Sequence, residues 1–508
     1  MASEKTETQT RTTASIVLDP EINIKDETGS WATRALTSTS ADDAASRKVL
    51  RKIDMRILPL LCISYALQFM DKASLSYASV YGIIQDNKLQ GQQYSWASSI
   101  FYFGYLGAAY PGIAIAHRFR LAKFLGINLT LWGVVLMATT ACSSFAGLAT
   151  ARFMLGVVEA PIGPGFVIMM GLWWSRQEQA SRSAIYISAV GSGGFLGALI
   201  VYGVAHIQGT LTSWKYIFLV LGGFTFIWGI FFTIYMPDGP ASAKWLDEDE
   251  KIIAVQRVID NKSGTRSRRF VKAQVIEAAT DPKIIIMGLI AIVNSLPSGG
   301  LAFGSLLIEG FGFDPLRTTL MNLPMFAIEI VCQLGAGLLF ARIPNSRLHI
   351  GSLALVPPII GTVLMNQLQP ANKWGRLAGY WLLGTYPVGL IVILNQLSTN
   401  IAGSTKKSVA TGWVYICFSV GQIVGPQFFK SSEAPGYRSG IVSLLCSLIL
   451  NLVFNQVLRV LYVLENRKRR KALEGKSEDE LIEMKKESEL QGFEDVTDGH
   501  NAMFFYAL

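Results

Sequence analysis

The chain has 508 residues, of which 51% are hydrophobic and 16% are charged, and its formal net charge is +9. An average soluble domain carries about 25% charged residues. The shortfall here comes from long apolar blocks, which are typical of membrane proteins and argue against a soluble fold. The basic residues cluster beside those blocks, where the positive-inside rule accounts for them, so the net charge does not indicate nucleic-acid binding.

Twelve apolar segments are each close to the roughly 20 residues that a helix needs to cross a bilayer. They lie at about 57–80, 95–116, 121–142, 146–173, 183–205, 214–236, 283–308, 320–341, 348–367, 376–400, 408–429 and 439–463. A charged stretch at 237–282 separates the first six from the last six. We therefore predict an all-α integral membrane protein with two six-helix bundles, at 57–236 and 283–464, joined by a cytoplasmic central loop at 237–282.

Lys and Arg near the ends of the segments set the orientation, because cytoplasmic loops carry an excess of both. The residues around the first, sixth, seventh and twelfth segments favour a cytoplasmic N-terminal tail, 1–56, and a cytoplasmic C-terminal tail, 465–508. We expect the N-terminal tail to be disordered. No basic-then-apolar leader precedes the first segment, so we expect no cleaved signal peptide. The plasma membrane is the expected location, and an internal membrane is left open.

The five cysteines occur singly in or beside apolar segments, and the four histidines show no metal-ligand spacing. We therefore expect packing cysteines, no metal and no cofactor. No clustered metal ligands or paired aspartates lie at a membrane face, which disfavours a membrane enzyme.

Charged residues interrupt two of the apolar segments. Asp71 and Lys72 lie in the first segment, and Arg152 and Glu159 lie in the fourth. A charged group at the bilayer centre costs about 2.5–3.5 kcal/mol on insertion scales, so such residues usually mark an ion or solute pathway. Asp71 and Glu159 are each roughly 20 Å into their segments, and Gln68 shares a helical face with Asp71. We expect these groups to share one cavity near mid-membrane that takes a small polar, anionic solute.

The second half of the chain offers further candidates. Tyr386, Asn395 and Tyr415 are expected to supply hydrogen-bonding walls to the cavity, whereas Glu329 in the eighth segment has no partner that the sequence identifies. The sequence Pro297-Ser-Gly-Gly300 in the seventh segment has two interpretations, which both stay open. It either breaks the helix and frees backbone groups for a ligand, or it serves close helix packing.

A series of motifs, in order from about residue 50 to the C-terminus, resembles one group of fungal transporters. They are Asp71-Lys72-Ala-Ser-Leu75-Ser-Tyr77, Ile100-Phe-Tyr-Phe-Gly-Tyr105, Arg152-Phe to Glu159-Ala160, Trp173-Trp174, Pro237-Asp238-Gly-Pro240, Gly310-Phe-Gly-Phe313, Asn400 to Lys407, Gly425-Pro426-Gln427, Ala434-Pro435-Gly-Tyr437 and Asp495 to Asn501. The series resembles the allantoate permease group of the anion:cation symporter family, within the major facilitator superfamily.

This resemblance implies a major facilitator fold of twelve helices, alternating access and proton-coupled uptake of organic anions. It assigns the proton chemistry to Asp71 and Glu159, the anion contact to Lys72, and an ion-partner role to Arg152. Many members of the wider family have Arg where this chain has Lys72, and a lysine lacks the bidentate fork of arginine. The chain also departs from the group at 297–300 and at Pro324-Met-Phe326, which affects the substrate more than the fold.

Structural interpretations of the same residues stay open. Glu159 could be an acid permanently paired with Arg152, Asp71 could be held ionised by Lys72 or Arg152, and Lys72 could serve to balance Asp71. Direct substrate contact by Arg152 is a further alternative.

The leading hypothesis is a proton symporter for a small organic anion of the allantoate, ureido acid, dipeptide or vitamin carboxylate type. Its partners would be that anion, protons and the lipid bilayer, and the protein would be a monomer. One alternative is an exporter working by antiport, although the glycine run at 191–197 lacks the proline expected of an antiporter. The other is a nutrient sensor that does not transport, although the tail after Tyr462 is short for a sensor.

Overall fold

The computed structural model of the chain describes residues 43–116, 119–259, 271–343, 345–474, 476–477, 479–480, 483–484, 495–501 and 503–508. The regular elements within these ranges are all helices. They form eleven segments, each of one to three consecutive helices, that are long and apolar enough to cross a membrane. Residues 260–270 of the predicted central loop and residues 1–42 of the predicted N-terminal tail lie outside the described part.

The described part of the first half of the chain contains eight α-helices. These are α2 (Asp43–Val80), α3 (Ile83–Asp86), α4 (Gln93–Ala116), α5 (Leu121–Ala138), α6 (Phe145–Glu159), α7 (Ile162–Trp173), α8 (Arg176–Val204) and α9 (Ser213–Tyr235). Two short 3-10 helices, η1 (Thr139–Ala141) and η2 (Pro240–Ser242), follow α5 and α9. The connection to the second half contains α10 (Glu248–Ile259) and α11 (Lys272–Thr280).

The second half contains more and shorter helices, because several spans are broken. They are α12 (Pro282–Ser295), α13 (Ser298–Ala302), α14 (Gly304–Gly310), α15 (Pro315–Met321), α16 (Leu323–Arg342), α17 (Arg347–Ala354), α18 (Val356–Gln367), α19 (Lys373–Trp381), η3 (Leu382–Thr385), α20 (Val388–Asn400), α21 (Ser404–Val424), η4 (Gly425–Phe428), η5 (Ser431–Glu433) and α22 (Arg438–Leu473). The seventh span is interrupted at Pro297, and Gly299 packs closely on Gly425, where a Cβ would lie 2.5 Å from the carbonyl oxygen. Features of both interpretations are therefore present, and a ligand role for the freed backbone groups remains a prediction.

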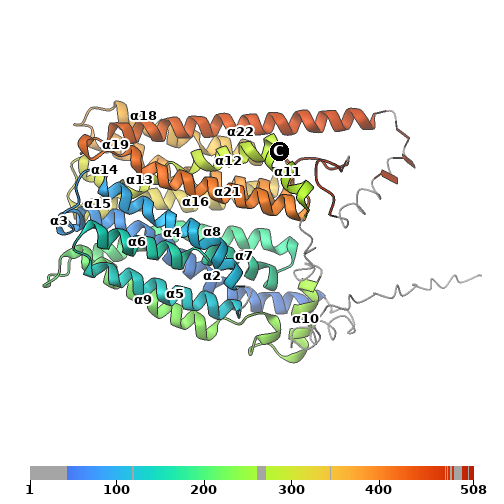
Figure 1. Cartoon of the computed structure of the whole chain (residues 1–508), viewed down its shortest axis with the longest axis horizontal. Coiled ribbons are helices and arrows are strands. Elements are labelled where there is room, and N and C mark those ends of the chain that lie inside the picture. Colours follow the sequence, from blue (N-terminus) through green and yellow to red (C-terminus); the bar gives the residue numbers. More distant parts are fainter. Residues whose placement is uncertain are drawn as a thin grey trace, which may run out of the picture.

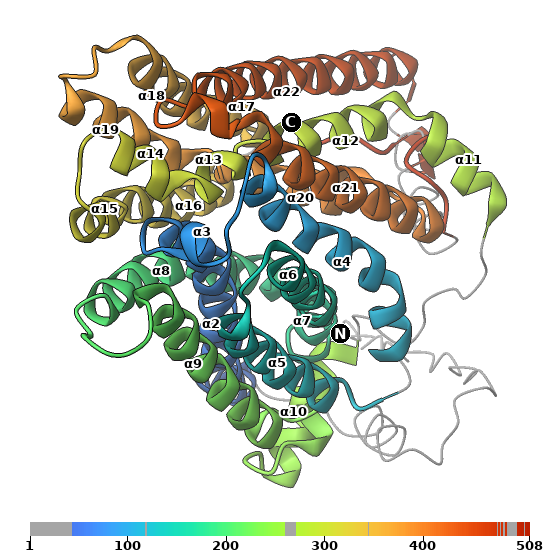
Figure 2. The same ribbon diagram turned by 60° about the vertical axis from the view of Figure 1, so that its left-hand side comes forward.

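The helices form two bundles that lie side by side (Figure 1). In the first bundle α5 packs on α9, α4 on α6, and α2 on α8; in the second, α12 packs on α21 and α22, and α18 on α19. The bundles meet where α8 contacts α16 and where α4 contacts α21. Figure 2 shows the first bundle, with α2, α5, α6 and α9, beside the second, with α12, α18, α19 and α22. The predicted all-helical fold of two bundles is confirmed.

The twelfth expected span is α4, which is long enough to cross a bilayer but is not among the eleven apolar helices. Its sequence contains Tyr94, Tyr102, Tyr105 and Tyr110 together with serines and glycines among its apolar residues. This composition suits a helix that packs between α6 and α21 rather than one surrounded by lipid.

The first helix begins at Asp43, earlier than residue 57, so the expectation of disorder up to residue 56 is wrong for its last part. Val49, Ile53 and Ile57 follow one another at intervals of four and are at most 1% exposed. Residues at this spacing share one helical face, so their burial extends the helix beyond the membrane span.

A polar cluster holds the first bundle together at the end where α2 begins. Arg182 on α8 binds Asp54 on α2 with an Nη2–Oδ2 distance of 2.7 Å, and Trp174 donates to the same carboxylate. Helix α10 adds ion pairs from Glu250 to Lys52 on α2 and from Arg257 to Glu178 on α8. The hydrogen bond from Lys52 lowers the pKa of Glu250, so this contact persists at neutral pH.

The corresponding end of the second bundle is held by residues 495–508, which we call the C-terminal segment. Lys406 at the start of α21 is fully buried, and its Nζ lies 2.8 Å from Asp498, 2.9 Å from Glu277 and 3.0 Å from Asp281. Three carboxylates therefore surround one buried ammonium. Asp498 comes from the C-terminal segment, so this part of the expected tail is a structural component of the bundle.

Further hydrogen bonds fix the C-terminal segment to two more helices, α20 and α22. The side-chain amide of Asn400 on α20 both donates to the carbonyl and accepts from the N–H of Ala507, each at 2.8 Å. Asn466 on α22 makes the same reciprocal pair with the backbone of Tyr506, at 2.9 Å. Arg469 donates to the carbonyl of Asp498 at 2.8 Å. The segment is thus bound through its backbone as well as through Asp498.

Replacing Asp498 with Asn should lower the thermal stability of the protein. The substitution removes one charged partner from buried Lys406, and hydrogen bonds to charged groups are worth about 1.5–3 kcal/mol. Thermal unfolding of the purified protein in detergent would measure the effect. Asp479→Asn, which neutralises an exposed acid on the same tail, is the control and should leave the melting temperature unchanged. Equal melting temperatures for both variants would contradict a structural role for the segment.

Candidate functional site

Asp71 faces the interior of the first bundle. Its side chain is fully buried, and Oδ2 accepts a hydrogen bond of 2.9 Å from Thr225 on α9. The second oxygen, Oδ1, is buried without a hydrogen-bond partner among the described residues. Asp71 is therefore oriented toward α9 and away from Lys72, which excludes the interpretation of Lys72 as its counter-ion.

Lys72 points in a different direction and pairs with Glu159. Adjacent residues on a helix are about 100° apart, so Lys72 faces α6, where its Nζ lies 2.7 Å from Glu159 Oε1. Gln68, one turn earlier on α2, donates to the same oxygen at 2.7 Å. We call these three residues the central cluster. Lys72 and Gln68 therefore meet Glu159. Asp71, which was expected to share one cavity with Glu159, faces α9 instead.

The two charges of the central cluster differ in their access to solvent. The side chain of Glu159 is 1% exposed, whereas that of Lys72 is 30% exposed. The Lys72 ammonium also lies 5.5 Å from the ring centroid of Phe101 and 6.0 Å from that of Tyr105, both on α4. An aromatic face attracts a cation within about 6 Å. Lys72 thus remains partly open to a solute while Glu159 is enclosed.

Arg152 does not pair with Glu159, so the predicted ion-partner role is wrong for this conformation. Seven residues separate the two on α6, a rise of roughly 10 Å, and Lys72 reaches the carboxylate instead. Arg152 is 4% exposed, its guanidinium lies 5.6 Å from the ring centroid of Phe218, and its Nε and Nη2 have no hydrogen-bond partner within the described part of the chain. The alternative of a permanent Glu159–Arg152 pair is excluded as well.

The local sequence places Glu159 at a helix break. Glu159 is the last residue of α6, and Pro161 separates it from α7. Proline has no N–H to continue the helical hydrogen bonds, which favours a bend at this position. Near the same level α6 approaches α4 closely at Gly156, where a Cβ atom would lie 2.0 Å from the carbonyl oxygen of Phe101. This approach brings Phe101 and Tyr105 to the central cluster.

The residues predicted from the second bundle are not joined to the central cluster by hydrogen bonds among the described residues. Asn395 donates to the carbonyl of Ile391 on its own helix at 2.9 Å. Tyr386 is half-buried after η3, and Tyr415 on α21 is 36% exposed. Their role as walls of the solute site remains a prediction. Asn400, another polar residue of this region, is occupied by the C-terminal segment.

Sequence reasoning missed the aromatic residues of the site. Tyr65 on α2 packs edge-on against Tyr186 on α8 with ring centroids 4.8 Å apart. Its hydroxyl and that of Tyr105 lie near Gly163, within 4.0 Å of where a Cβ would stand. The motif Ile100 to Tyr105 carried the family resemblance, and its alternation of aromatics and glycine was the available signal for a lining role.

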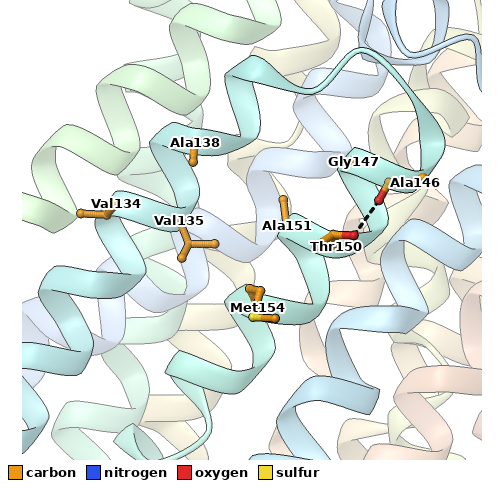
Figure 3. Close-up of a pocket in the computed structure, with 8 residues that line it drawn as sticks. All are labelled: Val134, Val135, Ala138, Ala146, Gly147, Thr150, Ala151 and Met154. Carbon is orange, nitrogen blue, oxygen red and sulfur yellow. Dashed lines mark hydrogen bonds between the residues drawn. The ribbon is translucent and has the colours of Figure 1, made fainter.

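A hollow of about 530 Å³ between α5 and α6 is a different feature (Figure 3). It is lined by Val134, Val135, Ala138, Ala146, Gly147, Thr150, Ala151 and Met154. The Thr150 hydroxyl donates to the carbonyl of Ala146 within the same helix. Because the lining carries no ionisable group and Val134 and Met154 are exposed, we assign this hollow to the lipid-facing surface and not to the solute site.

Hydrogen bonds join the two bundles at the end remote from the C-terminal segment. Tyr94 donates to the carbonyl of Ala302 at 2.9 Å, and Ser99 to that of Ile423 at 2.6 Å. Tyr81 bonds with Thr319 at 2.9 Å. These contacts connect the end of α2 and the first half of α4 to the second bundle, which closes the protein on that side.

Replacing Gly156 with Ala should destabilise the protein and disturb the central cluster. The new Cβ would overlap the backbone of α4, and overpacking in a close-packed interior costs about 1–3 kcal/mol. Thermal unfolding would measure the loss. Gly107→Ala on α4 is the matched control, because a Cβ there meets nothing within 4 Å. A melting temperature for Gly156→Ala equal to that of Gly107→Ala would show that α4 and α6 do not need this approach.

Comparisons with known proteins agree with this architecture. The family model described as Major Facilitator Superfamily matches residues 61–426. The allantoate permease of Saccharomyces cerevisiae is 32% identical over 91% of this chain and 86% of its own length. A thiamine pathway transporter of the same yeast is 33% identical over 91% of this chain and 86% of its own length.

A solved structure of a bacterial homologue of the human lysosomal transporter Spinster, in an inward-facing and unoccupied conformation, superimposes with a TM-score of 0.58. The alignment covers 84% of this chain and 97% of that protein at 14% identity. At this identity the likeness shows the fold alone.

Proposed function

The chain belongs to the major facilitator superfamily, as a multi-pass membrane transporter and not an enzyme, and on this premise we propose that it imports a small organic anion together with protons. The observation that carries the proposal is the Lys72–Glu159 pair, 2.7 Å apart. This pair places one partly accessible cation against one enclosed carboxylate. A cation of this kind is the expected contact for an anionic solute.

The pair couples the solute to a proton through charge balance. While Glu159 is ionised, it neutralises Lys72 and competes with an incoming anion. A proton on Glu159 removes the competing charge, so the Lys72 ammonium becomes available to the solute. By reciprocity, an anion bound to Lys72 favours protonation of Glu159. Proton and anion therefore bind together, which is the requirement for symport.

Neighbouring residues support this exchange in our proposal. Gln68 donates to Glu159 Oε1 and can turn to the solute when that carboxylate is protonated. Arg152, seven residues before Glu159 on α6, contributes a second positive charge. This charge favours anions over cations in the site. Asp71, hydrogen-bonded to Thr225, is proposed as a second carboxyl that responds to the protonation of the cluster. Tyr386, Asn395 and Tyr415 are proposed to contact the solute from the second bundle.

The substrate class follows from the chemistry of Lys72. A single ammonium offers a point charge suited to one carboxylate and lacks the fork geometry of arginine. The similarity to an allantoate permease and to a thiamine pathway transporter supports a ureido acid, a dipeptide or a vitamin carboxylate as the solute, with allantoate as the first probe. We further propose that the protein acts as a monomer in the plasma membrane, with both termini cytoplasmic.

The packing of the bundles supports alternating access for this transport. With the termini in the cytoplasm, the hydrogen bonds from Tyr94 and Ser99 to the second bundle lie on the external side. The conformation described here is therefore closed toward the outside, and import requires that these bonds break to admit the solute.

Replacing Glu159 with Gln should abolish the stimulation of uptake by an acidic external medium. The amide cannot be protonated, so Lys72 loses its proton-dependent competitor. Replacing Lys72 with Gln should lower uptake about 10-fold or more, because a lost charge-assisted contact costs about 1.5–3 kcal/mol. Uptake of labelled allantoate, ureido acids and dipeptides by expressing cells, in acidic and in neutral medium, would measure both effects.

The matched control is Glu309→Gln, which neutralises an exposed carboxyl of the second bundle and should transport like the unaltered protein. Undiminished pH dependence in Glu159→Gln would overturn the proposed coupling. Solute leaving preloaded cells, without uptake, would support export by antiport instead. Binding of a probe without movement in either direction would support a sensor.

A further inference from the structure

Another carboxyl, that of Glu329, lies between the two bundles, in a part of the protein that the proposed coupling does not use. Glu329 on α16 is 3% exposed and stands roughly 20 Å from the end of its helix at Arg342. Helix α16 packs here on α8, where a Cβ at Gly191 would lie 2.7 Å from Ile330 and 3.5 Å from Glu329. A Cβ at Gly194 would meet Phe326 at 2.5 Å. Glu329 is therefore enclosed by the contact between α8 and α16, which we call the bundle seam.

No cation neutralises this carboxyl within the described part of the chain. Its hydrogen-bond partner is Gln333, whose Nε2 donates to Oε1 at 2.9 Å. Helix α8 presents Gly191 to it, η3 presents Gly384, and Tyr386 is the titratable group that faces it from the end of η3. The charged residues of the surrounding helices engage other groups: Arg182 and Glu178 on α8, Arg317 on α15, Arg347 on α17, and Lys373 and Arg376 on α19.

An ionised Glu329 in this position would be costly. Burial of an unpaired charge in a low-dielectric interior is so unfavourable that such a group neutralises instead. Gln333 lacks a hydrogen-bond donor beside it. Its Oε1 is buried with no hydrogen-bond partner among the described residues. A proton on Glu329 removes the charge and supplies an O–H donor beside an acceptor that lacks one. One proton thus satisfies both groups.

We propose that Glu329 is a further proton-binding site, distinct from Glu159 and Asp71, which keeps its proton while the bundle seam is closed and exchanges it with water when the seam opens. The site takes a proton and no other ligand, since α8 and α16 are in direct contact around it. Its proton is tied to the relative position of the two bundles, whereas the proton on Glu159 is tied to the solute. This inference rests on the proposed function in one respect, the motion of the two bundles. It does not depend on the direction of transport or on the solute.

Infrared spectroscopy of the purified full-length chain in lipid bilayers tests the proposal directly. A protonated carboxyl shows a carbonyl stretch that a carboxylate lacks. At neutral pH, the difference spectrum between the unaltered protein and Glu329→Gln should contain this band, and it should shift in deuterated water. The control Glu309→Gln should lose carboxylate bands instead. A difference spectrum for Glu329→Gln that contains carboxylate bands would overturn the proposal.

Two further variants test the surroundings. Gln333→Leu removes the partner, so the carbonyl band should persist and move to the frequency of a less hydrogen-bonded acid. Gly191→Ala pushes against Ile330 and loosens the bundle seam, so the band should exchange with deuterium several-fold faster. Exchange at an unchanged rate would overturn the link to the seam. Because an amide is neutral and of equal size, Glu329→Gln should also fold normally, and its failure to fold would show that the native group is charged.

Neither measurement requires transport. A confirmed Glu329 band in a protein that takes up no acidic solute would leave this inference standing and overturn the proposed function. Acid-driven uptake that depends on Glu159, without a Glu329 band, would overturn this inference and leave the proposed function standing.

Discussion

An ion pair in the membrane interior organises the first bundle. Lys72 and Glu159 each occupy a position where an isolated charge would be strongly unfavourable, and their 2.7 Å contact lets both remain. Breaking a buried pair from one side leaves an uncompensated charge, at a cost of about 3–5 kcal/mol. Any event that releases Lys72 must therefore provide a replacement, either a proton on the carboxylate or a negative solute. Because of this constraint, the ion pair links the binding of a proton to the binding of a negative solute.

The surrounding packing keeps that exchange confined. Gly156 permits the close approach of α4 and α6 that brings Phe101 and Tyr105 to the Lys72 ammonium. At the membrane surface each bundle has its own polar cluster, built on Asp54 and Arg182 in one half and on Asp281 and Lys406 in the other. In each half, the chain that follows the last span of the bundle completes the cluster. This is α10 in the first half and the C-terminal segment in the second. The two bundles are thus stabilised separately and can move against each other.

The sequence predicted the helices well because apolar length and helical period depend on local composition. It also predicted a common depth for Asp71 and Glu159, because the rise per residue is constant, but not that Lys72 and Gln68 would reach Glu159 in place of Asp71. It assigned Arg152 to the wrong partner, since spacing along one helix does not reveal which neighbouring side chain reaches a carboxylate first. The docking of residues 495–508 could not be predicted, because the contacts of Asp498 and Ala507 join residues about a hundred or more positions apart.

The burial of Lys406 against Asp498 has a consequence for biosynthesis. In the first bundle, Arg182 meets an Asp54 that has already been made, and α10 follows soon after. Lys406, in contrast, enters the second bundle more than ninety residues before Asp498 leaves the ribosome. Domains generally fold as units in the order of their synthesis. The first bundle can therefore mature while translation continues, whereas Lys406 is held by Glu277 and Asp281 alone until Asp498 arrives to complete the cluster of the second bundle.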